Sequence, residues 1–412
     1  MKLFCLWWGL LMFCSAAQAL DTINPPGLLP TEIARPLLEH DPAVAAARAG
    51  LEVALREADL LDGSPYEWTA RSGTQRREIA SGAQYGEWSV GLERTIRLPG
   101  KALADRHLGG ATIEASEAAY GEALHESARH LLALWLDWQA AEHTSVLFAE
   151  HLLAVADNLA AVAKRVRAGD AATLDASVAK AEMAEQKRLH NDALTQASAA
   201  WARLSTRFPG INRQIEKLPS VVSIDDDVES LRERILAQSD EIKVVESALK
   251  LSHFHAARAD AERIPDPTVG VSAGWELAGR EKVAGISLSI PIPGSARSHN
   301  RDRALAATQV SLQELELKKR EINAEIAALV ASARGAHESV RLAQEGAQSA
   351  RDNARLMQRA YLLGEAELQT LLQTRRLQTT SESAVLTAQV TALKAYFSLM
   401  LDAHLIWDLA HD

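Results

Sequence analysis

The chain has 412 residues, of which 47% are hydrophobic and only 5% aromatic. This length would allow two or three globular domains, but few aromatic residues among many Ala, Leu, Glu and Arg residues favour long helices around a narrow core. The formal net charge of -10 argues against a nucleic-acid partner, because phosphate binding requires a basic surface.

The N-terminal residues have the pattern of a secretory leader. Lys2 provides a charged start, residues 3–13 form an apolar run, and residues 17–19 form a small-x-small cleavage site. We therefore predict a signal peptide over residues 1–19. After it, no uninterrupted apolar stretch approaches the roughly 18 residues of a membrane-spanning helix, so a membrane span would have to consist of strands.

Both cysteines, Cys5 and Cys14, lie inside this leader. The exported chain would then have no disulfide and no thiolate metal site. A lipoprotein signal needs a small residue just before the acylated cysteine, whereas Phe13 precedes Cys14. Lipidation at Cys14 is the less favoured alternative, and the sequence leaves it open.

The first half of the chain is expected to begin with an amphipathic helix over about residues 31–62 and to continue as a strand pair over residues 66–98. Two segments of alternating hydrophobicity, 66–73 and 86–99, flank a polar loop at 74–85. In the second segment, Arg94 interrupts a face that carries these apolar residues: Trp88, Val90, Leu92, Ile96 and Leu98.

A long helical hairpin is expected to follow this strand pair. Residues 101–166 contain no proline, and apolar or small residues recur in heptads from Tyr120 to Val166, which is typical of a coiled coil. A glycine turn at 165–175 then reverses the chain, so we predict a hairpin over residues 101–205. About 65 helical residues span on the order of 100 Å, which exceeds an ordinary globular domain.

The second half of the chain shows the same order of patterns about 195 residues later. In this half we expect a helix over about residues 226–262, a strand pair over 267–292, and a helical hairpin over 295–410 that turns near Gly364. A heptad seam again runs through the first long helix, from Ile322 to Tyr361. These matches predict an internal two-fold repeat.

The expected domain organisation follows from this repetition. Residues 20–206 form the first structural repeat and residues 228–412 the second. Between them, residues 207–227 carry two prolines and an acidic run, which predicts a linker with an acidic cap for the helix that follows.

Three short motifs suggest chemistry but fail on spacing. In "HESARH", His125 and His130 are five residues apart, so they lie about 140° apart around a helix and do not share a metal-binding face. In "HFH" (253–255) the two imidazoles lie on nearly opposite faces. "LPGK" lacks the glycine spacing and the Ser/Thr of a phosphate loop. We therefore predict no enzyme, no cofactor and no metal site.

The ensemble of strand pairs, Pro-Gly corners and glycine-tipped hairpins resembles the TolC family of outer-membrane efflux ducts. The corners are Pro99-Gly100 and Pro293-Gly294. Within the family, residues 36–61 ("PLLEHDPAVAAARAGLEVALREADLL") look most like the CzcC-type branch, which serves heavy-metal efflux pumps. The resemblance covers essentially the whole mature chain.

This resemblance implies a fold that is mainly α with a small β part. Three copies would each contribute four strands to a twelve-stranded outer-membrane barrel and long helical hairpins to a twelve-helix periplasmic tunnel. At each corner a strand leaving the membrane would turn into a tunnel helix. Proline would end the strand ladder, and glycine would tolerate the turn into the first helical residues.

The resemblance also implies where partners bind. The helical tips would dock a periplasmic adaptor (a membrane fusion protein) that joins the duct to an inner-membrane pump of the RND type. The docking positions that match the family are these: Gly169, Asp170, Leu174, Gly364, Glu365 and Leu368.

A gate is implied just above the tips. Asp175 matches an acidic ring of the family, whereas the second half has Thr370 and Gln373 at the matching positions. The alternative is that Asp175 only starts a helix, since acidic residues favour a first helical turn.

The leading functional hypothesis is a passive exit duct of a tripartite efflux system that conducts heavy-metal cations. One alternative keeps the duct but changes its cargo, to proteins of type I secretion or to drugs and solvents. An alternative from another class is a soluble periplasmic coiled-coil adaptor or scaffold.

Overall fold

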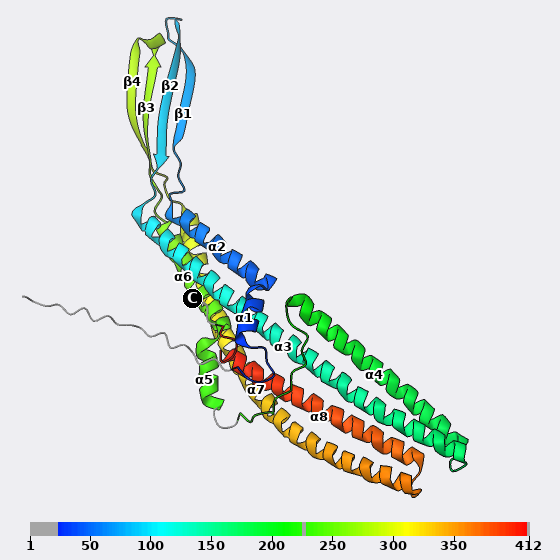
Figure 1. Cartoon of the computed structure of the whole chain (residues 1–412). Helices are drawn as coiled ribbons and strands as arrows, with labels where there is room; N and C mark the ends of the chain where they lie inside the picture. Colours follow the sequence, from blue (N-terminus) through cyan, green and yellow to red (C-terminus); the bar gives the residue numbers. More distant parts are fainter. Residues whose placement is uncertain (1–23, 225–227, 410–412) are drawn as a thin grey trace, which may run out of the picture.

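The computed structural model describes residues 24–224 and 228–409. The predicted signal peptide, with Cys5 and Cys14, lies outside these residues. The molecule is long, with a sheet at one end, two helical hairpins at the other and shorter helices between them (Figure 1). The predicted fold class, mainly helical with a small sheet, is confirmed.

The first half of the chain contains six elements. They are α1 (Thr31–Glu39), α2 (Pro42–Asp62), β1 (Thr69–Glu78), β2 (Gln84–Thr95), α3 (Pro99–Ala168) and α4 (Thr173–Arg207). The second half contains α5 (Val228–Gln238), α6 (Asp240–Ala261), β3 (Thr268–Glu276), the short 3-10 helix η1 (Leu277–Gly279), β4 (Glu281–Ser289), α7 (Ser295–Leu363) and α8 (Leu368–Asp402).

The four strands form one antiparallel sheet in the order β1-β2-β3-β4. Leu92 pairs with Val271, which pairs with Ile286, so these side chains share one face. Val271 and Ile286 are 57% and 88% exposed. The sheet thus has an uncovered apolar face, and its outer strands β1 and β4 have no neighbour on their far sides in the described chain.

The loop expected between the first two strands is much shorter than the sequence suggested. Residues 74–85 were expected to be a loop, but β1 continues to Glu78 and β2 begins at Gln84. The ladder continues here because antiparallel strands need only a tight turn, and Gly82 provides one with φ 82°. Polar side chains do not interrupt a strand whose faces are exposed.

The two short helical regions are each broken, against the expectation of single helices. The first breaks at Asp41, whose side chain accepts a hydrogen bond from the Ala43 N–H (2.9 Å) and caps α2, which starts at Pro42. The second breaks at Ser239, which accepts one from the Ile242 N–H (3.2 Å) and caps α6. Local capping chemistry therefore overrides the continuous apolar pattern.

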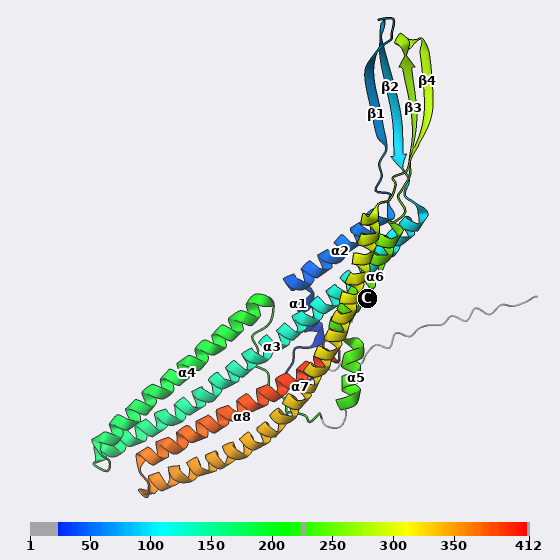
Figure 2. The same ribbon diagram turned by 180° about the vertical axis from the view of Figure 1, so that it is seen from behind.

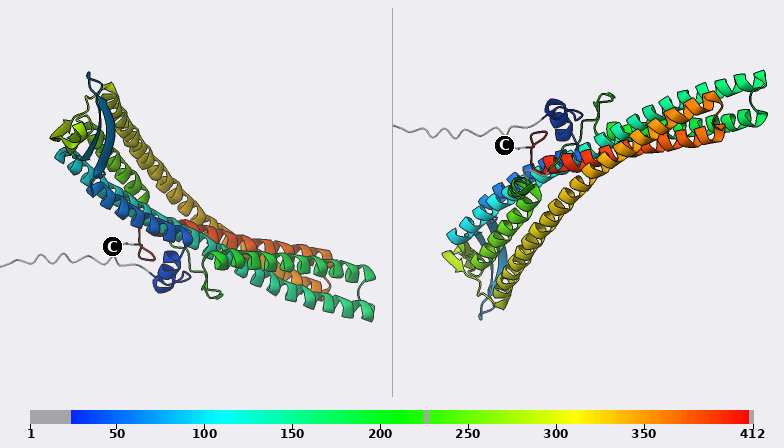
Figure 3. Two further views of the ribbon diagram at one scale, coloured as in Figure 1. Left: turned by 90° about the horizontal axis from the view of Figure 1, so that it is seen from above. Right: turned by 90° about the horizontal axis from the view of Figure 1, so that it is seen from below.

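The long helices have the predicted lengths and seams. α3 has 70 residues and α7 has 69, which corresponds to about 105 Å at 1.5 Å per residue. Near the sheet α3 packs against α2 and α6, and farther along it packs against α4 and α8. The hairpins α3-α4 and α7-α8 therefore extend side by side to a common end (Figures 2 and 3).

Two helices are apolar enough in composition to cross a membrane. α3 and α8 each contain an 18-residue window, with mean hydropathy 1.5 and 1.4. Neither helix has an uninterrupted apolar run of that length, so the sequence did not suggest a helical span. Long core helices pass the same test, so neither window defines a membrane span by itself.

The main core lies midway along the molecule, where the first and last described segments of the chain meet α3. Trp135 and Trp138 are buried and contact each other edge to face, with ring centroids 5.1 Å apart. The Trp135 indole N–H donates to the Gly27 carbonyl (2.9 Å) and that of Trp407 to the Leu29 carbonyl (2.8 Å). The last helix ends at Asp402, not near residue 410 as expected, because the following residues turn back over this core.

Candidate functional site: helical tips, gate and corners

Both hairpins turn through the same backbone motif at their tips. Gly169 and Gly364 follow α3 and α7 in the left-handed region, with φ 83° and 79°. Each glycine N–H donates to the carbonyl three residues earlier (3.1 Å), and the next N–H donates to the carbonyl five residues earlier (2.9 Å). This is the Schellman motif, in which a residue with a Cβ would be strained.

A small apolar cluster joins the two hairpins at this end. It contains the buried residues Val162, Ala179, Tyr361, Leu368, Leu371 and Leu372. The Arg165 guanidinium lies over the Tyr361 ring at 4.9 Å from the centroid. The tips of α3 and α7 are therefore held to each other within one chain.

The structure separates the docking residues expected from sequence into two groups. Gly169, Asp170, Gly364 and Glu365 are exposed at the turns, and Leu174 is 69% exposed. In contrast, Leu368 is only 4% exposed, because the first turn of α8 packs into the tip cluster. Its side chain holds the hairpins together and is not offered to a partner.

Two exposed leucines at the tip were missed. Leu362 and Leu363, at the end of α7, are 66% and 67% exposed. Their position immediately before Gly364 is a signal that the sequence does contain. With Leu174 they give the tips three exposed leucines.

Asp175 is the third residue of α4 and is half-buried. Its carboxylate makes no hydrogen bond or ion pair within the part of the chain that the structure describes. Its place in the first turn is favourable for a negative charge whether or not it also lines a tunnel. Thr370 and Gln373 are exposed on α8.

Ion pairs above the tips connect the hairpins further, and sequence reasoning did not find them. Glu182 on α4 is 3% exposed and pairs with Arg376 on α8. His151 on α3 pairs with Glu382 on α8 at 2.8 Å, and Arg351 on α7 lies 3.4 Å from the same carboxylate. These partners come from different helices, so no local motif in the sequence brings them together.

The first strand-to-helix corner is fixed by a buried charge network. Lys101 is 1% exposed and lies 3.0 Å from Asp266 and 3.2 Å from Glu262. Asp266 also accepts from the Leu98 N–H (3.0 Å) and the Tyr66 hydroxyl (2.7 Å). The hydrogen bond to Asp266, with burial, raises the pKa of Tyr66 to about 12. The network joins the start of α3 to the entry of β3.

Neither corner has a backbone conformation that requires glycine. Gly294 caps α7 with φ -97° and ψ 178°, and Gly100 lies in the first turn of α3, so neither has a left-handed backbone. Nothing lies within 4 Å of a Cβ placed at either position. Pro99, which opens α3, sets the backbone for a helix start instead. Pro293 lies outside β4 and directly before the cap of α7.

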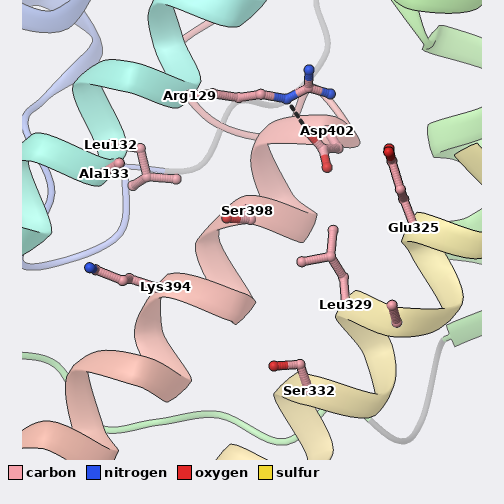
Figure 4. A pocket seen from close by; sticks show the side chains of 10 residues that line it. Arg129, Leu132, Ala133, Glu325, Leu329, Ser332, Lys394, Ser398 and Asp402 are labelled. Carbon is pink, nitrogen blue, oxygen red and sulfur yellow. Dashed lines mark hydrogen bonds and ion pairs between the residues drawn. The ribbon is translucent and has the colours of Figure 1, made fainter.

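A groove of about 560 Å³ lies between α3, α7 and α8 (Figure 4). Its walls include Leu132, Leu329 and Lys394, and Arg129 donates to Asp402 at 3.1 Å across one end. Ser332, Ser398 and Glu325 also line it. The groove is a recess between three helices.

The fold is that of TolC-like outer-membrane channels. The outer membrane channel CmeC of Campylobacter jejuni superimposes with a TM-score of 0.76 at 14% identity, over 92% of this chain and 86% of that one. The open-state MtrE outer membrane channel of Neisseria gonorrhoeae gives 0.71 at 18% identity, over 92% and 90%. The outer membrane protein VceC of Vibrio cholerae gives 0.71 at 16% identity, over 92% and 95%.

A family model also matches part of the sequence. Residues 231–401 match the family model described as outer membrane efflux protein. This segment covers most of the second half, including β3, β4 and the α7-α8 hairpin. A search of curated proteins found no match.

Proposed function

We propose that the chain is the exit duct of a tripartite efflux system, placed in the outer membrane with its helices in the periplasm. The observation that carries this proposal is the sheet, which combines an exposed apolar face with two free edges. An apolar face of this kind needs a lipid or protein cover. An open edge cannot face lipid, because its backbone groups would remain unpaired.

Several copies would therefore share one barrel. Four strands per chain are too few to close a barrel, whereas three copies supply twelve. The strands have 9 to 12 residues, close to the roughly 9–11 residues that cross a membrane. The homotrimer remains a proposal that follows from this arithmetic and from the resemblance.

The two halves of the chain would act as structural repeats, residues 20–206 and 228–412 joined by 207–227. The elements in the two halves have the same order, which supports this division. Each repeat would contribute one strand pair to the barrel and one hairpin to the tunnel. No chemistry is required of such a conduit, so no enzymatic role is proposed.

Fractionation and detergent extraction test the duct. We expect a detergent-stable trimer in the outer-membrane fraction. A monodisperse monomer that stays soluble without detergent would contradict the barrel and favour the coiled-coil adaptor or scaffold. The exposed apolar sheet counts against that alternative, because a soluble scaffold has no use for it.

The tips would dock a periplasmic adaptor that connects the duct to an inner-membrane pump of the RND type. Gly169, Asp170, Gly364 and Glu365 form the exposed turns, and Leu174 adds apolar surface. We expect a Gly169→Trp, Gly364→Trp double variant to trimerise but to lose cross-linking to its adaptor. Gly82→Trp is the matched control, since Gly82 also has a positive φ but lies at the opposite end.

We propose heavy-metal cations as the cargo, because residues 36–61 resemble the CzcC-type branch. A strain without the gene should become sensitive to one or more of zinc, cobalt, cadmium, nickel, copper and silver. Unchanged tolerance to all six, with new sensitivity to drugs or solvents or with loss of a secreted protein, would favour the other cargo classes.

A further inference from the structure

Three buried side chains from distant parts of the chain meet near the middle of the molecule. They are His125 on α3, Asp240 at the start of α6, and His404 just after α8. Their exposed fractions are 2%, 2% and 8%. One nitrogen or oxygen atom from each lies within 4.8 Å of the other two. We call these three residues the His-Asp-His cluster.

One carboxylate oxygen faces both imidazole rings. Asp240 Oδ2 lies 3.4 Å from His125 Nδ1 and 3.2 Å from His404 Nε2. The two rings are nearly perpendicular, with centroids 5.1 Å apart. Both nitrogens are buried, and neither makes a hydrogen bond of acceptable geometry in the described residues. Buried polar atoms are rarely left in this state, so the cluster calls for a ligand.

The spacing is that of metal ligands. Zinc binds imidazole nitrogen at about 2.0–2.1 Å and carboxylate oxygen at about 2.0–2.2 Å, in a tetrahedral arrangement. Two ligands at that bond length and angle lie roughly 3.3–3.4 Å apart. The two measured distances from Asp240 Oδ2 agree with this separation.

The side of the His125 ring that faces away from Asp240 also has the hydrogen-bond partner expected for a metal ligand. Its other ring nitrogen, Nε2, lies 3.2 Å from the Asp402 carboxylate. A metal-bound histidine almost always donates its second N–H to a carboxylate, a carbonyl or water, which fixes the ring. Asp402 is itself held by Arg129 at 3.1 Å. His125 is therefore oriented from behind toward Asp240.

The surrounding charge favours a cation. Arg129 lies within 4 Å of four carboxylates, those of Glu122, Glu126, Glu241 and Asp402. Asp240 has one further cationic partner, Lys243, on its other oxygen at 2.7 Å. Because carboxylates outnumber the basic groups around the cluster, a divalent ion would reduce the local charge imbalance.

We propose that His125, Asp240 and His404 bind a divalent transition-metal ion as part of the folded protein. Two imidazoles and one carboxylate favour Zn²⁺ and its neighbours Co²⁺, Ni²⁺ and Cu²⁺ over Mg²⁺ or Ca²⁺, which prefer oxygen ligands. The ion would join α3, α6 and the C-terminal segment. This site is separate from the cargo of the proposed function, since it lies among buried side chains of one chain.

Metal binding to the intact, purified protein tests the proposal. The protein is stripped with a chelator and titrated with Co²⁺, whose visible absorption reports tetrahedral coordination, and then with Zn²⁺ in competition. We expect one ion per chain, a Co²⁺ spectrum of tetrahedral type, and a rise in the thermal midpoint on adding Zn²⁺. Failure of the stripped wild type to bind either ion at one per chain would overturn the proposal.

Variants locate the ion. His404→Asn removes one ligand and keeps the backbone, because His404 has φ 54° and asparagine tolerates that region. We expect it to lose the tetrahedral Co²⁺ spectrum and the Zn²⁺-dependent rise in thermal midpoint. Asp402→Asn leaves all three proposed ligands in place and should weaken Zn²⁺ affinity by about 10–100-fold. If His404→Asn does not fold, Asp402→Asn provides the test in its place.

A matched control separates metal binding from the loss of any buried histidine. His151 pairs with Glu382 at 2.8 Å between α3 and α8 but belongs to no group of three candidate metal ligands among the described residues. His151→Asn should leave the Co²⁺ spectrum unchanged. Equal Co²⁺ and Zn²⁺ binding in wild type, His404→Asn and Asp402→Asn would show that the ion binds elsewhere and that the cluster is only an ion-paired network, and the proposal would fail.

Discussion

The Lys101 ammonium lies 3.0 Å from the Asp266 carboxylate, and both side chains are almost fully enclosed. This ion pair joins the first residues of α3 to the segment that enters β3, so it couples the two strand pairs at the base of the sheet. In the sequence, Lys101 is the last residue of "LPGK", a motif that did not predict its pairing with Asp266.

We expect Lys101→Met to destabilise the protein by about 3–5 kcal/mol, because it leaves a buried carboxylate without its main partner. Lys250→Met is the control, since Lys250 pairs with Glu114 at an exposed site and should cost less than about 1 kcal/mol. Thermal or denaturant unfolding of the two variants checks the difference. If Lys101→Met loses no more stability than Lys250→Met, the Lys101–Asp266 ion pair does not stabilise the corner.

The glycines of the tips and those of the corners should respond oppositely to alanine. Gly364→Ala places a Cβ in the left-handed region and should cost about 1–2 kcal/mol. Gly100→Ala lies in an ordinary helical turn with open space around it and should be neutral or stabilising by up to about 1 kcal/mol. The unfolding midpoints of both variants test this prediction. A larger loss of stability in Gly100→Ala than in Gly364→Ala would contradict the backbone geometry of these two positions.

Asp175→Ala should raise the single-channel conductance in planar bilayers. If three copies of Asp175 constrict the closed tunnel, their removal widens it and removes negative charge from its wall. Asp170→Ala is the control, because Asp170 is exposed at the turn itself and should leave the conductance unchanged. Equal conductance in wild type and Asp175→Ala would leave Asp175 as a residue of the first helical turn only.

The stability of the protein should fall as pH rises through neutrality because of Glu122. Burial raises the pKa of Glu122 to about 7, whereas it is about 4.3 in an unfolded chain. The folded state therefore binds the proton more tightly, and this contribution is complete below about pH 4 and is lost as pH rises through 7.

Glu122→Gln keeps the neutral form at every pH, so its melting midpoint should fall less between pH 5 and pH 8 than that of the wild type. The measurement should be made in the presence of a chelator, so that metal binding does not contribute. Glu126→Gln is the control, as Glu126 is a half-exposed partner of the same Arg129. An identical pH dependence in wild type and Glu122→Gln would exclude this role.

Periodic features were predictable from the sequence, and contacts between distant segments were not. The heptads around Leu131 and Ile326 predicted the buried seams of α3 and α7, because a seam repeats along one helix. The strand face with Leu92 was predictable for the same reason. The broken helices were missed because a single cap, such as Asp41, outweighs a long apolar pattern.

The cluster around His125 shows why the rest could not be predicted. In the sequence, the nearest histidine after His125 is His130, but the two side chains do not lie together. His130 is exposed and pairs with Glu126. The groups that do meet His125 lie beyond residue 239, in other helices. Likewise, the burial of Leu368 depends on how the two hairpins pack against each other.

The contact between Trp407 and Leu29 has a consequence for the order of assembly. It joins residues that are 378 positions apart in the sequence, so the central core cannot be completed until the chain has been made as far as Trp407. Before that moment, the large apolar surfaces of α3 around Trp135 and Trp138 have no cover from the C-terminal segment. Long-range closures of this kind slow folding, so the incomplete chain should depend on chaperones. Removing Trp407 and the residues that follow it should therefore lower the yield of folded protein.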